Sequence, residues 1–149
     1  MAKKYIGGIG LGMRLLLDHS KPGVDAFDSE NPLIFVTGPL TGTVGPTAGN
    51  GYAVVSKSPQ SGGIGEAKAH GFFGAELKRA GYDAIIFTGK AEKLVYWWID
   101  DYSVQLIDAS RFAGKAPEDT EKTIRDELKD HYIRVAAIGL AGEKLVRTA

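Results

Sequence analysis

The sequence predicts an α+β fold in which short strands form mixed β-sheets and only a few helices accompany them. Apolar runs of strand length occur at residues 33–37, 52–57 and 84–88, each flanked by glycine or proline. Helical patterns are few and do not alternate regularly with these runs, as they would in a parallel α/β fold. At 149 residues, with 44% apolar and 24% charged residues, the chain has the length and composition of one soluble globular domain.

The first helix is predicted over residues 13–19, where Leu11 and Leu15 mark an apolar stripe at helical spacing. Glycines at positions 7, 8, 10 and 12 lead into it. Their spacing does not match the dinucleotide-binding pattern G-x-G-x-x-G, and the chain contains no P-loop. We therefore expect these glycines to let the helix pack closely against a sheet.

The stretch from residue 38 to residue 74 is dense in glycine and yet contains a strand pattern at 52–57. Ordered glycine marks unusual backbone dihedrals or a close approach of the main chain. Two interpretations stay open. The glycine-rich loops form a surface of backbone N–H and C=O groups for a large polar ligand, or they are tight turns that join short strands.

A helix is predicted in the last part of this stretch, from about Glu66 or Gly71 to Ala80. Glycines at positions 62, 63 and 65 precede it. Because backbone N–H groups at a helix N-terminus attract anions, the arrangement predicts an anion site there. Lys68 either adds a positive charge to that site or is simply solvated.

The second half of the chain predicts a hairpin, a surface helix and a last strand. Residues 94–99 and 103–107 alternate around a polar turn, which is typical of a β-hairpin. Pro117 begins a helix whose first turn is acidic, and Ile124 belongs to its narrow apolar stripe. The final strand is predicted over residues 134–138.

Few side chains are candidates for chemistry. His70 lies between glycine-rich segments, where it could bind an anionic ligand or donate a proton. A structural histidine at a helix start is an equally open interpretation, since one histidine without partners is no catalytic constellation. The chain has no cysteine, which excludes disulfides and thiolate-bound metal within it.

Composition also limits the partners and the location of the protein. Eighteen basic residues balance eighteen acidic ones, which argues against nucleic acid as a partner. No apolar run approaches the roughly 20 residues that span a bilayer, and the start lacks a secretory apolar segment. We therefore expect a cytoplasmic protein. Both ends interrupt patterned segments, so we expect a domain of a longer protein, and a short natural chain with frayed ends is the alternative.

Several blocks of sequence resemble the N-terminal domain of the tungsten-containing aldehyde ferredoxin oxidoreductases. In chain order they are GPLTGT at 38–43, SKSP at 56–59, FGAELKRAGYDAI at 73–85, GKAEK at 89–93, IDAS at 107–110 and IGLAGE at 138–143. The resemblance covers nearly the whole chain. It implies that residues 1–149 form a single pterin-cofactor-binding domain with that family's α+β fold.

The same resemblance implies a tungsten (or molybdenum) bis-pyranopterin cofactor with a bridging magnesium ion. Enzymes of this family oxidise aldehydes to carboxylic acids with water and pass electrons through a [4Fe–4S] cluster to ferredoxin. The cluster and the proton-transfer residues belong to C-terminal helical domains, which lie beyond this chain. Those domains and ferredoxin are therefore the implied partners, and the isolated domain is expected to be non-catalytic.

The implied cofactor contacts lie in two segments of the glycine-rich stretch. Asn50 and Gly51 occupy a loop in which the family often has arginine. In the second segment, Lys68 stands where asparagine is frequent, and its backbone carbonyl is the implied magnesium ligand, a role that survives a change of side chain. His70 stands in place of a glycine. The contact residues are Asn50, Gly51, Lys68, Ala69, His70 and Gly71.

A hypothesis of a different class is a non-catalytic module. In that case the chain is a stand-alone remnant, or an assembly module that binds no metal. A CxxCxxxC cluster motif beyond residue 149 would favour the oxidoreductase, and its absence would favour the module.

Overall fold

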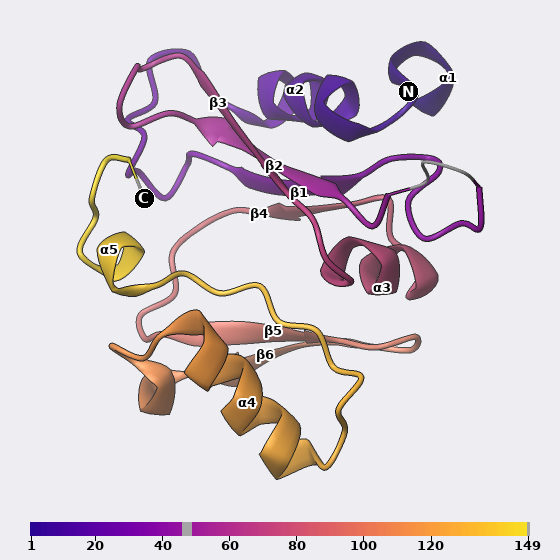
Figure 1. The fold of residues 1–149 in the computed structure, drawn as a ribbon. Coiled ribbons are helices and arrows are strands. Elements are labelled where there is room, and N and C mark those ends of the chain that lie inside the picture. The colour runs from indigo at the N-terminus through magenta and orange to yellow at the C-terminus, as the bar shows by residue number, and fades with distance from the viewer. Residues whose placement is uncertain (46–48, 149) are drawn as a thin grey trace. The chain divides into compact units, whose positions relative to one another are not determined.

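A computed structural model describes residues 1–45 and 49–148 of the chain, which divides into two compact units, Met1–Lys90 and Ala91–Ala149 (Figure 1). In the first unit the elements are α1 (Ala2–Tyr5), α2 (Gly8–His19), β1 (Leu33–Thr37), β2 (Tyr52–Lys57), β3 (Ile64–Ala69), α3 (Phe73–Arg79) and β4 (Ala84–Phe87). In the second unit they are β5 (Val95–Ile99), β6 (Val104–Asp108), the 3-10 helix η1 (Ser110–Phe112), α4 (Pro117–Leu128) and α5 (Leu140–Glu143). The predicted α+β class is confirmed.

The first unit is built on a four-stranded sheet in the order β3-β2-β1-β4. Each neighbouring pair is antiparallel, with Phe35 of β1 opposite Val54 of β2 and Ile85 of β4. The two apolar runs at the centre form β1 and β2, as the sequence predicts. The strand β3 lies at one edge of the sheet, which matters for the site described below.

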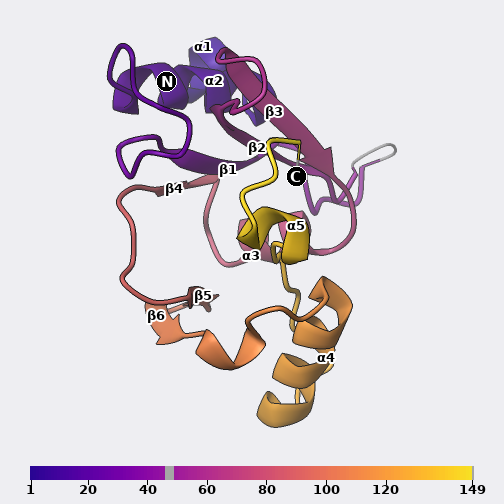
Figure 2. The same ribbon diagram turned by 90° about the vertical axis from the view of Figure 1, so that its left-hand side faces the viewer.

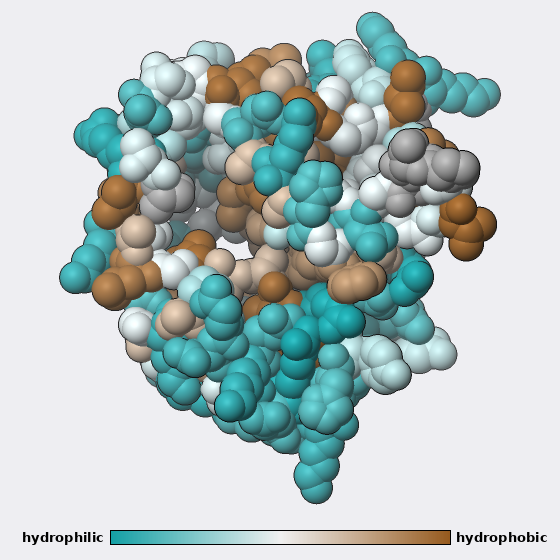
Figure 3. Space-filling model, viewed as in Figure 1, coloured by the Kyte–Doolittle hydropathy of each residue, from teal (hydrophilic) through white to brown (hydrophobic). Residues whose placement is uncertain are grey.

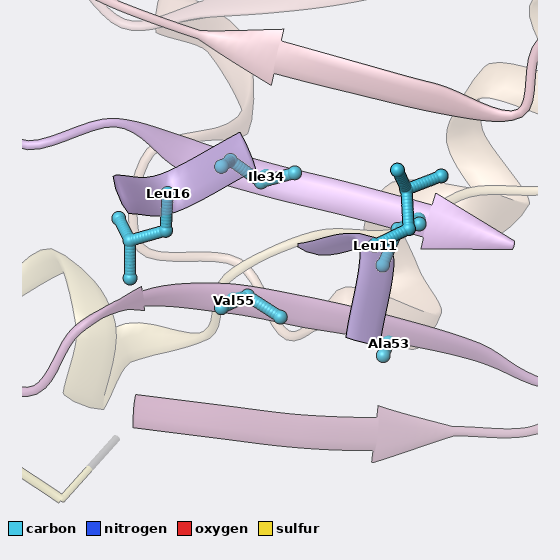
Figure 4. Packing of buried hydrophobic residues seen from close by; sticks show 6 residues of the cluster. Leu11, Leu16, Ile34, Ala53 and Val55 are labelled. Atoms are coloured by element: carbon cyan, nitrogen blue, oxygen red, sulfur yellow. The ribbon is translucent and has the colours of Figure 1, made fainter. Parts of the chain in front are cut away.

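Helix α2 covers one face of this sheet, and its leucines make the core (Figure 4). Leu11 and Leu16 pack over Ile34 and Val55, whose side chains are fully buried. Gly12 faces the sheet at the closest point, because a Cβ built on it would lie 2.8 Å from Val55 Cγ2. The predicted close packing of a glycine-bearing helix on a sheet is thus confirmed.

Helix α3 lies on the opposite face of the sheet from α2 (Figure 1 and Figure 2), and aromatic rings pack around its first residue. Phe73 of α3 packs against Tyr52 and Phe35, with ring centroids 5.0 and 6.0 Å apart. Tyr52 stacks on Phe35 at 5.8 Å, and burial raises the pKa of its phenol. Phe87 of β4 meets Phe35 edge to face at 5.5 Å. The aromatic contacts place the start of α3 beside the start of β2.

The helix predicted from Glu66 is wrong, whereas its later start near Gly71 is close to the observed one. Residues 64–69 form β3, which pairs with β2 along its whole length, and α3 begins at Phe73. Pairing with β2 gives these residues a ladder of hydrogen bonds that local helix propensity cannot match. Gly71, at φ +104, then turns the chain into α3, and Gly81 follows the helix with φ +93.

The second unit is a hairpin packed against a small core. β5 and β6 pair antiparallel, with Trp97 opposite Leu106, as the hairpin prediction requires. Phe112 and Ile124 are buried together, and Tyr96 of β5 packs on Phe112 at 6.0 Å. Helix α4 begins at Pro117 as predicted, and its outward surface is hydrophilic (Figure 3).

The hairpin turn is held by one carboxylate. The main-chain N–H groups of Tyr102 and Ser103 donate to Asp100 at 2.8 and 2.7 Å, and the Trp98 indole donates to it at 3.1 Å. The hydrogen bond from Tyr102 is the first cause that lowers the pKa of Asp100, followed by the bonds from Ser103. The turn therefore favours the ionised carboxylate.

The strand predicted over residues 134–138 is wrong. These residues form no strand, and Ile133 and Val135 pack instead against the core around Phe112. The Arg125 guanidinium donates a hydrogen bond to the Ile133 carbonyl at 2.8 Å, so this carbonyl next to the predicted strand has a side chain as its partner and not a neighbouring strand. Within the described residues, no helix is long and apolar enough to cross a membrane.

Candidate functional site

The sequence-predicted site residues meet at one end of the β2–β3 pair. Tyr52 lies opposite Ala69 and Ala53 opposite Lys68, so the residues before β2 and after β3 are neighbours. A Cβ built on Gly51 would lie 3.3 Å from His70 Nδ1, which means that the imidazole packs directly on the Gly51 main chain. The structure therefore brings Asn50–Gly51 together with Lys68–Gly71 although 16 positions separate the two segments along the chain.

The register fixes which peptide groups of β3 point away from the sheet. In antiparallel pairs, hydrogen-bonded and non-hydrogen-bonded positions alternate. The Ser58 N–H donates to the Gly63 carbonyl at 2.8 Å, so this pair is a hydrogen-bonded one. Counting back along the ladder, Ala67 and Ala69 bond to β2, whereas Glu66 and Lys68 direct their N–H and C=O groups outward.

A second hydrogen bond on the far side of the sheet gives the same alternation. The Thr37 N–H donates to the Asp83 carbonyl at 2.9 Å, so odd-numbered residues of β1 bond toward β4 and even-numbered ones toward β2. Odd-numbered residues of β2 therefore bond to β1, and its even-numbered residues bond to β3. Lys68, opposite Ala53, again points its peptide groups to the open edge.

The carbonyl of Lys68, which points away from the sheet, fits the magnesium ion that is expected with the cofactor. β3 is an edge strand, and both Lys68 and His70 have exposed side chains. The Lys68 carbonyl is thus a main-chain oxygen at the surface, the kind of ligand that magnesium accepts. Gly71 adds open main chain, because a Cβ built on it would meet no atom within 4 Å. Neither observation depends on which side chain residue 68 carries.

The loop before β2 is fixed by Thr41, a residue that the sequence analysis did not single out. Its hydroxyl donates to the Gly51 carbonyl at 3.1 Å and accepts the Gly38 N–H at 3.0 Å. The side chain is only 7% exposed. In the sequence, Thr41 is visible as a threonine between two glycines of a loop. Its partner, the Gly51 carbonyl, can be identified only in the folded structure.

Two glycines of the site serve packing within the fold rather than a ligand. A Cβ on Gly74 would lie 2.8 Å from the Asn50 carbonyl oxygen and 3.1 Å from that of Gly51. The bare Cα of Gly51 makes room for the His70 ring. At these two positions the missing Cβ makes room for neighbouring groups of the fold, and of Gly51, Gly71 and Gly74 only Gly71 leaves open main chain.

The predicted anion site at a helix N-terminus is wrong. Glycines 62 and 63 lie in the β2–β3 turn, and Gly65 lies within β3, so they precede a strand and not a helix. Lys68 lies near the other end of β3 from this turn. Among the described residues, no group of three or more His, Asp or Glu side chains could hold a metal ion. Asn50, Lys68 and His70 are the polar side chains among the predicted contact residues, beside the main-chain groups described above.

Comparison with known proteins gives the family. A family model described as aldehyde ferredoxin oxidoreductase, N-terminal domain, matches residues 1–149. The chain is 51% identical over 148 residues to the tungsten-containing aldehyde ferredoxin oxidoreductase of Pyrococcus abyssi and 51% identical over 149 residues to that of Pyrococcus furiosus. These matches cover 99% and 100% of this chain but 24% of each relative.

A solved structure shares the fold. The active-site complex BamBC of benzoyl coenzyme A reductase, in complex with 1,5-dienoyl-CoA, superposes with a TM-score of 0.91 at 41% sequence identity. The match covers 95% of this chain and 22% of that one. The chain thus spans about a quarter of the length of the relatives it matches. With the family match running over every residue, the chain belongs to the aldehyde ferredoxin oxidoreductase family, whose N-terminal domain it represents.

Proposed function

We propose that this chain is the cofactor-binding N-terminal domain of a tungsten bis-pyranopterin oxidoreductase that converts aldehydes to carboxylic acids, with ferredoxin as electron acceptor. The identity of 51% to tungsten-containing aldehyde ferredoxin oxidoreductases supports the aldehyde reaction. The identity to a benzoyl coenzyme A reductase complex is lower, at 41%, so we favour aldehyde oxidation over the reduction of benzoyl coenzyme A. The proposal includes a cytoplasmic location, in keeping with a chain that has no cysteine to form disulfides.

The observation that carries the proposal is the outward peptide of Lys68 at the open edge of β3. Its carbonyl oxygen would bind the magnesium ion that bridges the two pterin phosphates. Asn50 and Gly51 on one side, and Ala69 to Gly71 on the other, would form the surrounding contacts. The bound cofactor would supply a two-electron oxidation, in which an aldehyde and water give a carboxylic acid, two protons and two electrons.

The residues of this chain hold the cofactor and do not act on the aldehyde. Among the described residues no group of three or more His, Asp or Glu side chains could hold a metal, and the side chains of Lys68 and His70 at the site are exposed. The Lys68 ammonium beside pterin phosphates would add positive charge, and the His70 imidazole could form a hydrogen bond there, which would strengthen binding of a phosphorylated ligand. The substrate channel, the [4Fe–4S] cluster and the ferredoxin contact would belong to other domains of the same protein, consistent with relatives four times as long.

The test uses the full-length protein, produced anaerobically in cells supplied with tungstate and purified by gel filtration. Wild-type protein should carry tungsten and pterin, which are measured by elemental analysis and by fluorescence of the oxidised pterin. Lys68→Ala should keep most of the tungsten, because the carbonyl remains. Gly71→Val should lose it, because φ +104 is unfavourable for a branched side chain and the main chain beside Lys68 must move.

Gly62→Val is the matched control for Gly71→Val. Gly62 also has positive φ, +73, and open space around its Cα, but it lies in the β2–β3 turn away from the proposed site. It should lose a similar amount of stability and keep its tungsten. Full-length wild-type protein that is folded but holds neither tungsten nor pterin would contradict the proposal and favour a module that binds no metal.

A further inference from the structure

We propose that Thr41 is a positioning residue of the cofactor site, which acts by holding the main chain of Asn50 and Gly51 in place. The inference rests on the proposed function, because it assigns Thr41 to the same site. Thr41 is not itself one of the residues that we propose to contact the cofactor. Its effect is transmitted through the Gly51 carbonyl, which accepts its hydroxyl proton.

The geometry gives Thr41 two bonds at one oxygen. The hydroxyl accepts the Gly38 N–H, and it donates to Gly51, which lies directly before β2. Gly38 follows β1, and Thr37 of β1 pairs with Tyr52 of β2. The hydroxyl thus continues the β1–β2 ladder for one step beyond its last pair, at a place where no strand pairing holds the loop. It is the one side-chain hydrogen bond to residues 50 and 51 among the described residues.

Gly51 contacts both segments of the proposed site. His70 packs on the Gly51 Cα, and the Gly74 Cα lies close to both the Asn50 and the Gly51 carbonyl oxygens. A shift of the Gly51 carbonyl would therefore move the Asn50 main chain on one side and the His70 ring on the other. These are members of the two segments that the proposed cofactor would contact. Loss of one hydroxyl at position 41 would loosen both segments together.

Burial makes the hydroxyl hard to replace by water. Thr41 is 7% exposed, so a substitution that removes its oxygen leaves the Gly38 N–H and the Gly51 carbonyl without this partner in a nearly closed space. The Gly51 carbonyl would then turn toward solvent to find a new donor. Removal of a group that orients a metal ligand typically changes metal affinity by about 10- to 100-fold, and we expect a change of the same order for a residue that orients the cofactor's main-chain contacts.

The experiment separates positioning from plain stability through a matched control. Thr120 of α4 is another buried threonine, 8% exposed, whose hydroxyl donates to the Ala116 carbonyl at 3.1 Å. In the full-length protein, Thr41→Val loses the two hydrogen bonds of its buried hydroxyl and Thr120→Val loses one, so both should unfold at a lower temperature, and Thr41→Val at the lower of the two. Tungsten retention during dialysis against a chelator is then measured at a temperature at which both are folded.

Thr41→Val should release tungsten about 10- to 100-fold faster than wild type, while Thr120→Val should match wild type. Thr41→Ser keeps the hydroxyl and should restore slow release. If Thr41→Val does not fold, Thr41→Ala, which adds no branched apolar group, takes its place. Equal retention in the Thr41 and Thr120 variants would overturn the positioning role. A wild-type protein that is folded and holds no tungsten would overturn the proposed function itself, and the role of Thr41 with it.

Discussion

Replacement of Gly12 by alanine tests how closely α2 packs on the sheet. The added Cβ would lie 2.8 Å from Val55 Cγ2 and 3.0 Å from Val36 Cγ1, well inside the 3.5–4.0 Å of an ordinary carbon contact. Both valines are fully buried, so they have no free space to move into. Overpacking of this kind costs about 1–3 kcal/mol. Alanine in place of glycine favours the helix by about 1 kcal/mol, which offsets part of that cost.

Gly10→Ala isolates the packing cost from the helix preference. Gly10 is exposed in the same helix, and its Cβ would meet only the Tyr5 carbonyl, at 3.3 Å. It gains the same helix preference without the collision, so Gly12→Ala should be less stable than Gly10→Ala by about 1–3 kcal/mol. Urea unfolding followed by circular dichroism measures the difference. Adding Val55→Ala should relieve the collision, so the double variant with Gly12→Ala should be more stable than the sum of the two single effects predicts.

Two results would refute this reasoning. One is equal stability of Gly12→Ala and Gly10→Ala, since the closer contacts of Gly12 with Val55 and Val36 should make Gly12→Ala the less stable variant. The other is strict additivity of Gly12→Ala and Val55→Ala, because contacting residues that share one space should couple. Either outcome would mean that α2 lies farther from the sheet than its packing in Figure 4 indicates.

Three further predictions concern the site and the hairpin turn. Gly74→Ala places a Cβ 2.8 Å from the Asn50 carbonyl oxygen, so it should lower the free energy of unfolding by about 1–3 kcal/mol, measured by urea titration. Ala67→Pro removes an N–H that bonds to β2, whereas Lys68→Pro removes an N–H that points away from the sheet. Ala67→Pro should therefore be the less stable variant by about 1 kcal/mol or more in urea unfolding. Equal losses of stability would show that the hydrogen-bonded and outward-pointing positions of β3 are assigned wrongly. The lowered pKa of Asp100 contributes stability above its unfolded pKa of about 3.9, and this is lost as the pH falls through the lower folded pKa. The difference in urea midpoint between wild type and Asp100→Asn should therefore shrink below about pH 4, and a difference that stays constant with pH would contradict the turn's preference for the carboxylate.

The parts of the fold that the sequence predicts well are those with a strong local pattern. The buried strand β1 is a continuous apolar run between proline and glycine, and α4 begins at Pro117 with acids in its first turn. Such signals need no knowledge of distant partners. The close packing predicted for the α2 glycines is confirmed for Gly12, which contacts the sheet, whereas Gly8 and Gly10 do not approach it.

The errors arise where a distant partner decides the structure. Residues 64–69 have the composition of a helix start, yet β2 offers them a full ladder. Residues 134–138 have the composition of a strand, yet no neighbour pairs with them within the described residues, and Val135 joins the small core instead. The candidate site is proposed from the family resemblance, whereas the sequence does not predict the hydrogen bond from Thr41 to Gly51. That hydrogen bond depends on a contact between positions 41 and 51 that only the folded loop creates.

The open edge of β3 has a consequence for how this family can vary. A ligand that binds at such an edge contacts the main chain, whereas the side chains of residues 66 and 68 lie on a face of the sheet. Under the proposed function, mutation can therefore exchange those side chains and keep the main-chain surface that would contact the cofactor, provided that β3 keeps its register with β2. A shift of one residue in the pairing of β3 with β2 would turn the Lys68 carbonyl toward β2. The main-chain surface at the edge would then be lost even though the sequence is unchanged.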